Sequence, residues 1–190
     1  MAGHAETPSH GSKLTYEDYV SLPNDGRRYE ILDGELVVSP SPRTAHQRVV
    51  QELFVALRAW SIEHRLGETF FAPYDVILDD TTVVVPDLVF VSRSRSAIIT
   101  ARAIEGAPDL IVEVLSESTE RHDRGAKMKL YARYGVERYW IVDPDERTLE
   151  IYSLLDGSYT QLGTYRDDAI VTCEVPVGLE LRLGDVWPTG

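Results

Sequence analysis

Two long apolar runs, each interrupted by one acidic residue, constrain this chain more than any other feature of its sequence. Residues 83–91 read VVVPDLVFV with Asp87 inside the run, and residues 110–115 read LIVEVL with Glu113 inside it. Runs this rich in branched side chains are typical of strands covered on both faces. An ionised carboxylate in such a strand costs several kcal/mol unless it is paired or bound to a metal. Two such acids on neighbouring strands would make a cation site; in the alternative, each lies at a strand end and faces water.

The size and composition favour a single globular domain. The chain has 190 residues, of which 43% are hydrophobic, enough for one sizeable core. We expect residues 14–190 to form this domain and the polar residues 1–13 to form a disordered tail.

No segment approaches the roughly 20 apolar residues that cross a bilayer, and the start lacks an apolar signal segment, so we expect no membrane association and a cytoplasmic protein. Cys173 is the one cysteine, which excludes an intrachain disulfide and a cysteine-based zinc cluster.

The charge balance limits how the chain can contact nucleic acid. The formal net charge is −12, with 19 basic and 31 acidic residues. Proteins that coat nucleic acid rely on a basic surface that neutralises phosphates. Any contact with DNA or RNA must therefore be local. Lysine is scarce, with only Lys13, Lys127 and Lys129, so a lysine on a buried face would stand out.

Local signals predict the first half of the fold. Thr15 and Asp18 fit a capping box for a short helix that ends before Pro23. Asp33-Gly34 predicts a tight hairpin between strands at 28–33 and 35–39, because this dipeptide tolerates positive φ. Apolar residues then recur at spacings of three and four, which predicts a long helix over about 44–64 that covers the sheet. The residues on this face are His46, Val50, Leu53, Leu57, Trp60 and His64.

The second half alternates strands with one further helix. We expect short strands at 68–72, 74–78, 83–86 and 88–91, with a meander around Asp79-Asp80 and Pro86, followed by the acid-bearing strand at 109–115. A helix over about 123–134 should end at Gly135, the usual residue for a left-handed cap. A strand at 137–142 and further strands within 147–183, with turns at Asp156-Gly157 and Asp167-Asp168, complete an α/β (α+β) pattern.

The predicted helix over 123–134 carries a lysine in the middle of its apolar face. At about 100° per residue, Leu130, Tyr131 and Tyr134 fall on the same side as Lys127, whereas Lys129 falls on the opposite side. The side chain of Lys127 could extend along this face until its ammonium reaches water. The functional interpretation is that Lys127 reaches a buried acidic site between the helix and the sheet.

An acid, a second acid and a lysine, carried on strand, strand and helix, suit phosphodiester hydrolysis. Carboxylates hold a divalent cation, which polarises the phosphate and lowers the pKa of a bound water. A nearby ammonium orients that water or stabilises the charge that develops on the phosphate. The PD-(D/E)XK nucleases are built in this way, with Pro86-Asp87 here as the first element and Glu113-Val114-Leu115 as the second. Leu115 stands where that pattern has lysine, and Lys127 could take its place from the helix.

Five ordered segments resemble the Uma-two family of restriction endonucleases within this superfamily. They read RRYEILDGEL at 27–36, VPDL at 85–88, APDLIVEVLS at 107–116, DRGAKMKLY at 123–131 and YWIVDP at 139–144. The resemblance covers roughly residues 14–183. It implies a restriction-endonuclease-like fold, with a central mixed β-sheet flanked by helices and extra β-hairpins. It also implies that Asp87 and Glu113 are metal ligands and that Lys127 is the catalytic lysine.

Other polar residues are weaker candidates. Asp109 shares a strand face with Glu113 but lies about 13 Å from it at 3.3 Å per residue, too far to share one magnesium ion. Pro144-Asp145 fits a turn. Glu30, in the hairpin segment, could add a third carboxylate through water or be an exposed strand acid. His46 could contact a phosphate or support Glu30, or be a packed or solvent-facing histidine.

Two classes of function fit these observations. In the first, Asp87, Glu113 and the backbone carbonyl of Val114 hold Mg²⁺ or Mn²⁺, and Lys127 assists a water that attacks nucleic acid, with DNA as the expected substrate. In the second, a noncatalytic protein keeps the nuclease fold for binding or assembly, which the acidic composition favours. Unpaired edges of the C-terminal strands could also join two copies, so we expect a homodimer.

Overall fold

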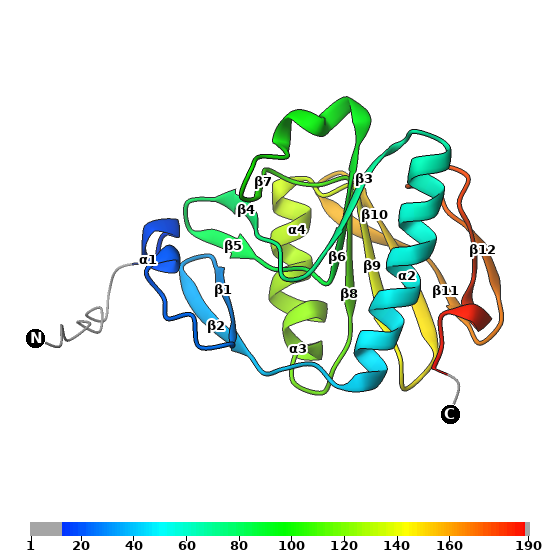
Figure 1. Ribbon diagram of the computed structural model, residues 1–190, viewed down its shortest axis with the longest axis horizontal. Helices are drawn as coiled ribbons and strands as arrows, with labels where there is room; N and C mark the ends of the chain where they lie inside the picture. The colour runs from blue at the N-terminus through cyan, green and yellow to red at the C-terminus, as the bar shows by residue number, and fades with distance from the viewer. Residues whose placement is uncertain (1–12, 189–190) are drawn as a thin grey trace, which may run out of the picture.

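The computed structural model of the protein describes residues 13–188 (Figure 1). The predicted tail therefore falls outside the described residues, except for Lys13. The ammonium of Lys13 lies 2.6 Å from Asp33 in the first hairpin. None of the helices in the described part of the chain is long and apolar enough to cross a bilayer.

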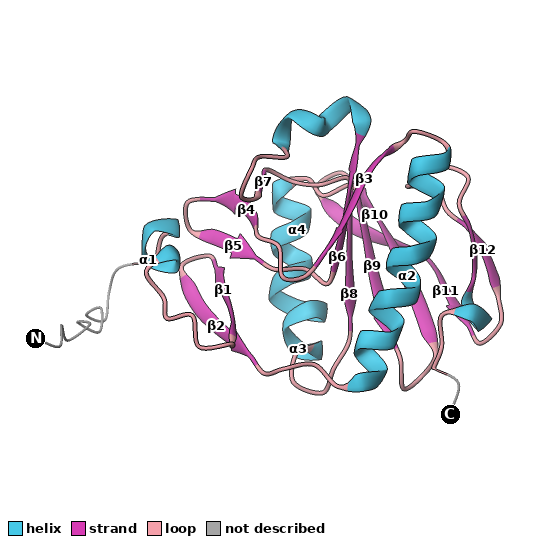
Figure 2. Ribbon diagram, viewed as in Figure 1, coloured by secondary structure: helices cyan, strands magenta, loops and turns pink. Residues whose placement is uncertain are grey.

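The described residues form two main β-sheets and a small pair of strands, with helices packed on them (Figure 2). The smaller main sheet contains β1 (Arg28–Leu32), β2 (Glu35–Ser39), β4 (Val76–Asp79), β5 (Thr82–Val84) and β7 (Ile104–Glu105). The larger contains β3 (Gly67–Phe71), β6 (Leu88–Ser92), β8 (Leu110–Val114), β9 (Arg138–Asp143), β10 (Thr148–Leu155) and β11 (Ser158–Arg166). The separate pair is β12 (Ile170–Thr172) and β13 (Glu180–Arg182). The helices are α1 (Tyr16–Val20), α2 (Thr44–Glu63), α3 (Glu120–His122) and α4 (Met128–Tyr134), with 3-10 turns at Arg93–Ile98 and Leu183–Asp185.

The six-stranded sheet is mixed and covered on both faces. Its order is β11-β10-β9-β8-β6-β3, with β8 and β9 parallel and the other pairs antiparallel. Alternate residues of β8 point to opposite faces. Val112 belongs to the group of buried apolar side chains that includes residues of α2, and Ile111 belongs to the group that includes residues of α4. The strand is thus covered on both sides, as its continuous apolar sequence predicts, and the mixed α+β class is confirmed.

Local sequence signals place most boundaries correctly. The Thr15–Asp18 capping box precedes α1. Asp33 and Gly34 have φ of 55° and 86° and join β1 to β2 in the expected hairpin. On α2, the predicted face is buried from His46 to Leu57, but Trp60 is only half-buried and His64 is exposed. His64 falls outside the buried face because the helix already ends at Glu63.

The predicted meander is right at its first turn and wrong at its second, since β4 and β5 pair across Asp79-Asp80 but β5 and β6 do not pair. β5 pairs with β1 and β4 in the five-stranded sheet, whereas β6 pairs with β3 and β8 in the six-stranded sheet. The chain therefore changes sheets at residues 85–87. Pro86 has no backbone N–H to donate to the hydrogen bonds between strands. It therefore suits a segment that passes between two sheets better than the interior of a paired strand. The consequence for the site is that Asp87 lies where the two sheets meet.

The helix that carries Lys127 begins earlier than predicted and contains a π-helical turn. α3 starts at Glu120, the π turn spans Asp123–Lys127, and α4 continues to Tyr134, where Gly135 closes the helix with φ of 84°. Lys127 is buried and Lys129 is exposed, as the helical spacing predicts. A π turn within a helix often marks a functional site. Here Asp123 and Lys127, the first and last residues of the turn, are both buried.

Candidate active site

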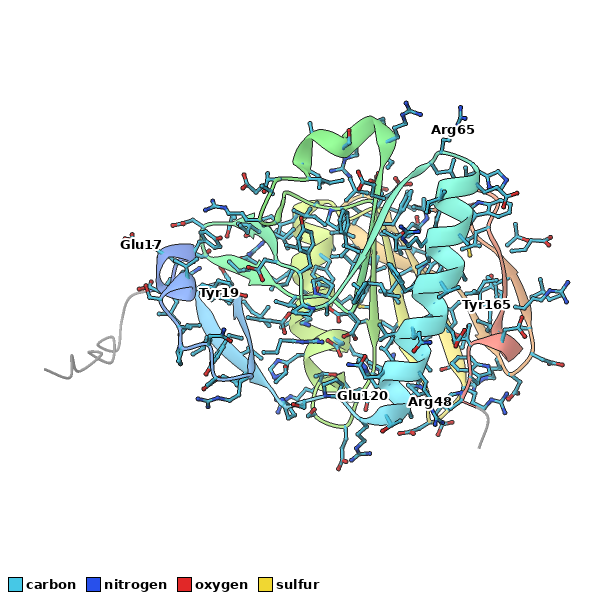
Figure 3. The ribbon with its side chains drawn as sticks, in the orientation of Figure 1. Glu17, Tyr19, Arg48, Arg65, Glu120 and Tyr165 are labelled. Atoms are coloured by element: carbon cyan, nitrogen blue, oxygen red, sulfur yellow. The ribbon has the colours of Figure 1, made fainter. Side chains whose placement is uncertain are left out.

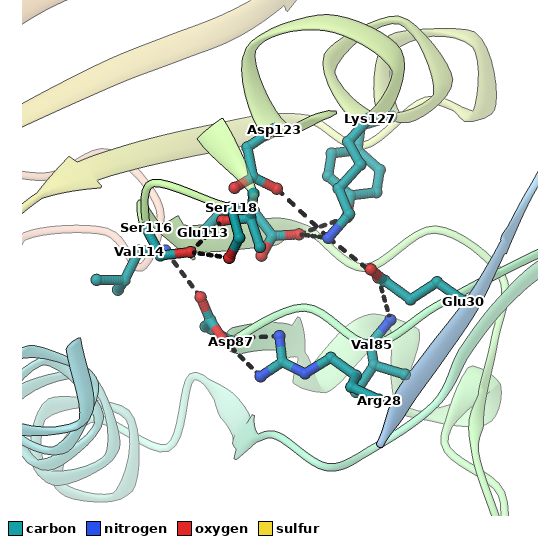
Figure 4. Close-up of polar contacts among 12 residues, drawn as sticks. Arg28, Glu30, Val85, Asp87, Glu113, Val114, Ser116, Ser118, Asp123 and Lys127 are labelled. Carbon is teal, nitrogen blue, oxygen red and sulfur yellow. Dashed lines mark hydrogen bonds and ion pairs between the residues drawn. The ribbon is translucent and has the colours of Figure 1, made fainter. Parts of the chain in front are cut away.

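Asp87 immediately precedes β6, and Glu113 lies in β8, its neighbour in the six-stranded sheet. β6 pairs with β8 so that Leu88 is opposite Val112, which places Asp87 beside the end of β8 that carries Glu113. The backbone N–H of Val114 donates to Asp87 Oδ2 at 2.9 Å (Figure 4). Asp87 is 3% exposed and Glu113 is 1% exposed. The alternative that these acids face water at strand ends is therefore wrong.

Lys127 reaches the acids from the helix on the other side. Its ammonium nitrogen lies 3.0 Å from Glu113 Oε1, 3.0 Å from Glu30 Oε1 and 3.4 Å from Asp123 Oδ1. The residue is only 2% exposed, so the alternative in which its ammonium extends to water is also wrong. Asp87, Glu113 and Lys127 thus meet in one buried cluster.

Glu30 belongs to this cluster directly. It is 1% exposed, and its Oε1 accepts a hydrogen bond of 2.9 Å from the backbone N–H of Val85 as well as the contact with Lys127. The interpretation of Glu30 as an exposed strand acid is therefore wrong. This bond also links β1 to residues 85–87, the segment that passes from one sheet to the other and contains Asp87.

His46 is buried, but it supports Asp87 rather than Glu30. Its Nε2 lies 3.0 Å from Asp87 Oδ2. Asp87 Oδ1 accepts two further bonds, of 3.1 and 3.0 Å, from the guanidinium of Arg28. Arg28 was not a sequence candidate. The signal was available, however, because Arg28 and Glu30 are two residues apart on one strand and so share a face.

Asp123 and Tyr131 also join the site without having been predicted as members. They lie four residues before and after Lys127, a spacing that keeps side chains on one helix face. The Tyr131 hydroxyl donates to Glu113 Oε1 at 2.7 Å, the same oxygen that Lys127 contacts. Tyr131 is buried on the helix face that the spacing predicted to be apolar, and its hydroxyl fixes one oxygen of Glu113.

The cluster holds more negative than positive groups. Four carboxylates face two permanent cations, Arg28 and Lys127, together with His46; the carboxylates are those of Glu30, Asp87, Glu113 and Asp123. Buried charge of one sign that exceeds its partners is costly. The arrangement therefore favours the uptake of a proton or of another cation.

The pKa shifts follow from this imbalance. Burial raises the pKa of Glu113 to about 8, and the charges of Asp123, Asp87 and Glu30 add to the shift against the opposing effect of Lys127. Burial also acts to raise the pKa of Asp87, but the hydrogen bond and charge of His46 and the charge of Arg28 lower it to about 2. Burial opposes the charge of Lys127, yet the surrounding carboxylates raise its pKa well above the usual value. Lys127 is therefore an ammonium at neutral pH.

Carboxylate and carbonyl oxygens are the kind of donor that a hard divalent cation prefers. Within residues 13–188, no three His, Cys, Asp or Glu side chains form a ready-made metal site. Mg²⁺ does not require one, because it commonly binds through one or two carboxylates and completes its shell with waters and substrate phosphate. Asp123 Oδ1 is buried and accepts no hydrogen bond, although the Lys127 ammonium lies 3.4 Å away. The residues that would hold the ion are Asp87 and Glu113 with the carbonyl of Val114.

Other polar candidates lie outside the cluster. Asp109 accepts a hydrogen bond of 2.7 Å from the backbone N–H of Ser92, which is a structural role. The guanidinium of Arg124, in the π turn, pairs with Glu150 at 2.8 Å. Asp145 lies in the turn after β9, as predicted.

A cavity of about 610 Å³ leads to Asp87. Its walls come from α1, the loop after it, β1, the start of α2 and the chain before β6. Residues that line it include Tyr19, Arg28, Tyr29, His46, Pro73 and Asp87. Asp87 is the acid of the cluster that lines this cavity.

A solved structure shares this fold. A crystal structure described as "a putative nuclease belonging to DUF820 from Anabaena variabilis" matches 92% of this chain and 97% of that chain, with a TM-score of 0.76 and 21% sequence identity. At this identity the likeness establishes the fold alone. The chain therefore has the mixed α+β fold of that nuclease-like structure.

The particular family follows from the sequence match. The family model Uma2, described as "Putative restriction endonuclease", matches residues 16–184. The chain therefore belongs to the Uma2 family, which confirms the resemblance of the five segments. A search of curated proteins finds no significant match.

Proposed function

We propose that this protein is a metal-dependent nuclease that hydrolyses phosphodiester bonds of nucleic acid, with DNA as the expected substrate. The observation that carries the proposal is the meeting of Asp87, Glu113 and Lys127, from three separate elements, in one buried cluster beside a cavity. Membership of the Uma2 family supports the same reaction class.

Mg²⁺ or Mn²⁺, bound by Asp87, Glu113 and the Val114 carbonyl, would polarise the phosphate and activate a water. The protein's own groups position the reactants. Arg28 carries a planar guanidinium suited to two oxygens of one phosphate, and it already binds an anionic group in this place, the carboxylate of Asp87.

Lys127 acts as a charged donor and not as a base. Because the carboxylates keep its ammonium protonated, it cannot accept a proton from water at neutral pH. It can instead orient the attacking water and stabilise the negative charge that develops on the phosphate. Glu30 and Asp123 hold this ammonium from two sides, and Tyr131 holds the oxygen of Glu113 that faces it.

A cleavage assay with matched variants tests the proposal. Labelled single- and double-stranded DNA is incubated with the protein in Mg²⁺, Mn²⁺ or EDTA. We expect metal-dependent cleavage that falls by about 100-fold or more in Asp87→Asn and Lys127→Met, as for loss of a group that stabilises developing charge. Asp109→Asn is the matched control, since it changes a buried acid that also follows proline but lies outside the cluster.

Thermal unfolding provides a second readout. Mg²⁺ or Mn²⁺ should raise the melting temperature of the wild type and of Asp109→Asn but not of Asp87→Asn, because a ligand that binds only the folded state stabilises it. An equal shift in all three proteins would contradict the assigned ligands.

A noncatalytic binding or assembly protein is the second candidate. It is favoured by the contacts of Asp87, whose two oxygens are already bonded by Arg28, His46 and the Val114 N–H. Failure of the wild type to cleave any single- or double-stranded DNA or RNA, with either metal, would establish this candidate over the nuclease.

We also propose a homodimer formed through a sheet edge. β11 and β3 end the six-stranded sheet, and an open strand edge is able to pair with another chain. Light scattering coupled to size-exclusion chromatography would show twice the 21.4 kDa chain mass for a dimer, and a single chain mass would exclude it.

A further inference from the structure

Two cavities, not one, border the part of the site that contains Arg28 and His46. The first, of about 610 Å³, leads to Asp87, and the second, of about 510 Å³, extends toward the loop after β8. The walls of the first come from α1 and the start of α2, found in Figure 3 near the labels of Tyr19 and Arg48. The second is lined by Arg28, Ser41, Arg43, His46, Ser116 and Thr119, among others.

The two cavities share one boundary. Arg28, His46 and residues 40–42 line both of them. A flexible chain that runs from one cavity to the other must therefore pass Arg28, beside Asp87. This places Arg28 and His46, the side chains that contact Asp87, at the junction, with a hollow on either side.

The size of the cavities and the burial of the acids favour an unpaired strand over a duplex at the junction. Each volume lies within the range of about 300–1,000 Å³ that is typical of small-molecule sites, which suits one or two nucleotides. Asp87, Glu113 and Lys127 are at most 3% exposed, so the reacting phosphate must enter the hollow. A duplex holds its phosphates on a rigid rod with paired bases, whereas an unpaired strand can bend and separate its bases.

The charged side chains around the two cavities also favour an unpaired strand over a duplex. Duplex binding depends on several basic side chains that neutralise phosphates. The three arginines that line the cavities all have acidic partners: Arg27 donates to Asp25 at 2.7 Å, Arg43 to Glu117 at 2.7 Å and Arg28 to Asp87 at 3.0 Å. With a net charge of −12, the affinity must come from the enclosed nucleotides rather than from a basic surface.

On these grounds, and resting on the nuclease function proposed above, we propose that the substrate is an unpaired segment of DNA or RNA. Its successive nucleotides occupy the two cavities, and the phosphate that joins them lies at Arg28. The first cavity also offers the rings of Tyr19 and Tyr29, and aromatic rings of this kind stack with any base. The selectivity is therefore for an unpaired state rather than for a base sequence.

A binding experiment with charge variants on α2 tests this inference. Gln47 is exposed and lines the first cavity, whereas Gln51, one turn further along the helix, is exposed and does not line it. Fluorescence anisotropy measures the Kd of the full chain for a labelled single-stranded DNA, the same sequence as RNA, and the DNA duplex. The titrations are made in EDTA and again with Ca²⁺, another oxygen-ligated divalent cation.

We expect both unpaired strands to bind at least tenfold more tightly than the duplex in at least one of these conditions. Gln47→Glu should weaken this binding about fivefold to tenfold and Gln47→Lys should tighten it, because a unit charge close to a phosphate changes the affinity by about this factor. The corresponding Gln51 variants should change Kd by less than about twofold, because their charges are further from the strand and screened by solvent.

The outcomes separate this inference from the nuclease function. Equal or tighter binding of the duplex, identical effects at Gln47 and Gln51, or no binding of either strand would overturn the inference, even if metal-dependent cleavage were observed. Binding of unpaired strands that follows the Gln47 pattern, without cleavage in Mg²⁺ or Mn²⁺, would support the inference and refute the catalytic role. A difference between the DNA and RNA strands would identify which sugar the cavities accept.

Discussion

The excess of buried negative charge around Glu113 predicts an unusual dependence of folding stability on pH. The pKa of Glu113 is raised from 4.5 to about 8 in the folded protein, first by burial and then by neighbouring carboxylates. Between these values the folded state holds a proton that the unfolded state releases. Stability must therefore fall as pH rises through this window. Since one pKa unit corresponds to about 1.4 kcal/mol, the loss from this group is on the order of 3–5 kcal/mol.

Glu113→Gln isolates this contribution, because glutamine resembles the protonated acid but does not titrate. Urea unfolding followed by tryptophan fluorescence at about pH 5 and about pH 8 gives the free energy of unfolding. We expect the variant and wild type to be similar at the lower pH. At the higher pH the metal-free variant should be more stable by on the order of 3–5 kcal/mol.

Glu150→Gln provides a control of opposite sign. Hydrogen bonding to Arg124 lowers the pKa of Glu150. The carboxylate of Glu150 therefore stabilises the folded protein at pH values above its pKa in the unfolded chain. Replacing it should destabilise the protein at both pH values. If wild type and Glu113→Gln gave parallel profiles, or if the Gln variant were the less stable at about pH 8, the proposed charge imbalance would be refuted.

Three further substitutions test other parts of the structure, each by the midpoint of urea unfolding. Lys127→Met should lower the stability by about 3–5 kcal/mol at neutral pH, because it leaves buried carboxylates without their shared cation. Leu57→Ala should cost about 2–5 kcal/mol, since Leu57 is 1% exposed in the core, while the Mg²⁺-induced melting shift persists. Gly34→Ala should cost about 1 kcal/mol or more, because φ is 86° and an added β-carbon would collide with Lys13.

The sequence predicted those parts of the fold that depend on local chemistry. Asp33-Gly34 forms the hairpin and Gly135 ends the helix, because these residues adopt positive φ at little cost. The burial of Lys127 and the exposure of Lys129 followed from helical spacing. The apolar run around Glu113 identified a strand covered on both faces.

Features that depend on long-range packing were not available from the sequence. The change of sheet at residues 85–87 could not be distinguished from a meander, because both place two short strands on either side of Pro86. The partners of Asp87 come from positions 28 and 46, about 59 and 41 residues away, and no local pattern links them. The π turn at Asp123–Lys127 has no simple sequence signature.

The most direct test of the central claim is a crystal structure of the protein soaked with Mn²⁺, with the ion located by its anomalous scattering. The proposal predicts one strong peak within ligand distance of Asp87 and Glu113, near the carbonyl of Val114, with Lys127 still beside Glu113. A peak elsewhere, or an acid pair that remains bonded only to Arg28, His46 and Lys127 at saturating Mn²⁺, would contradict it.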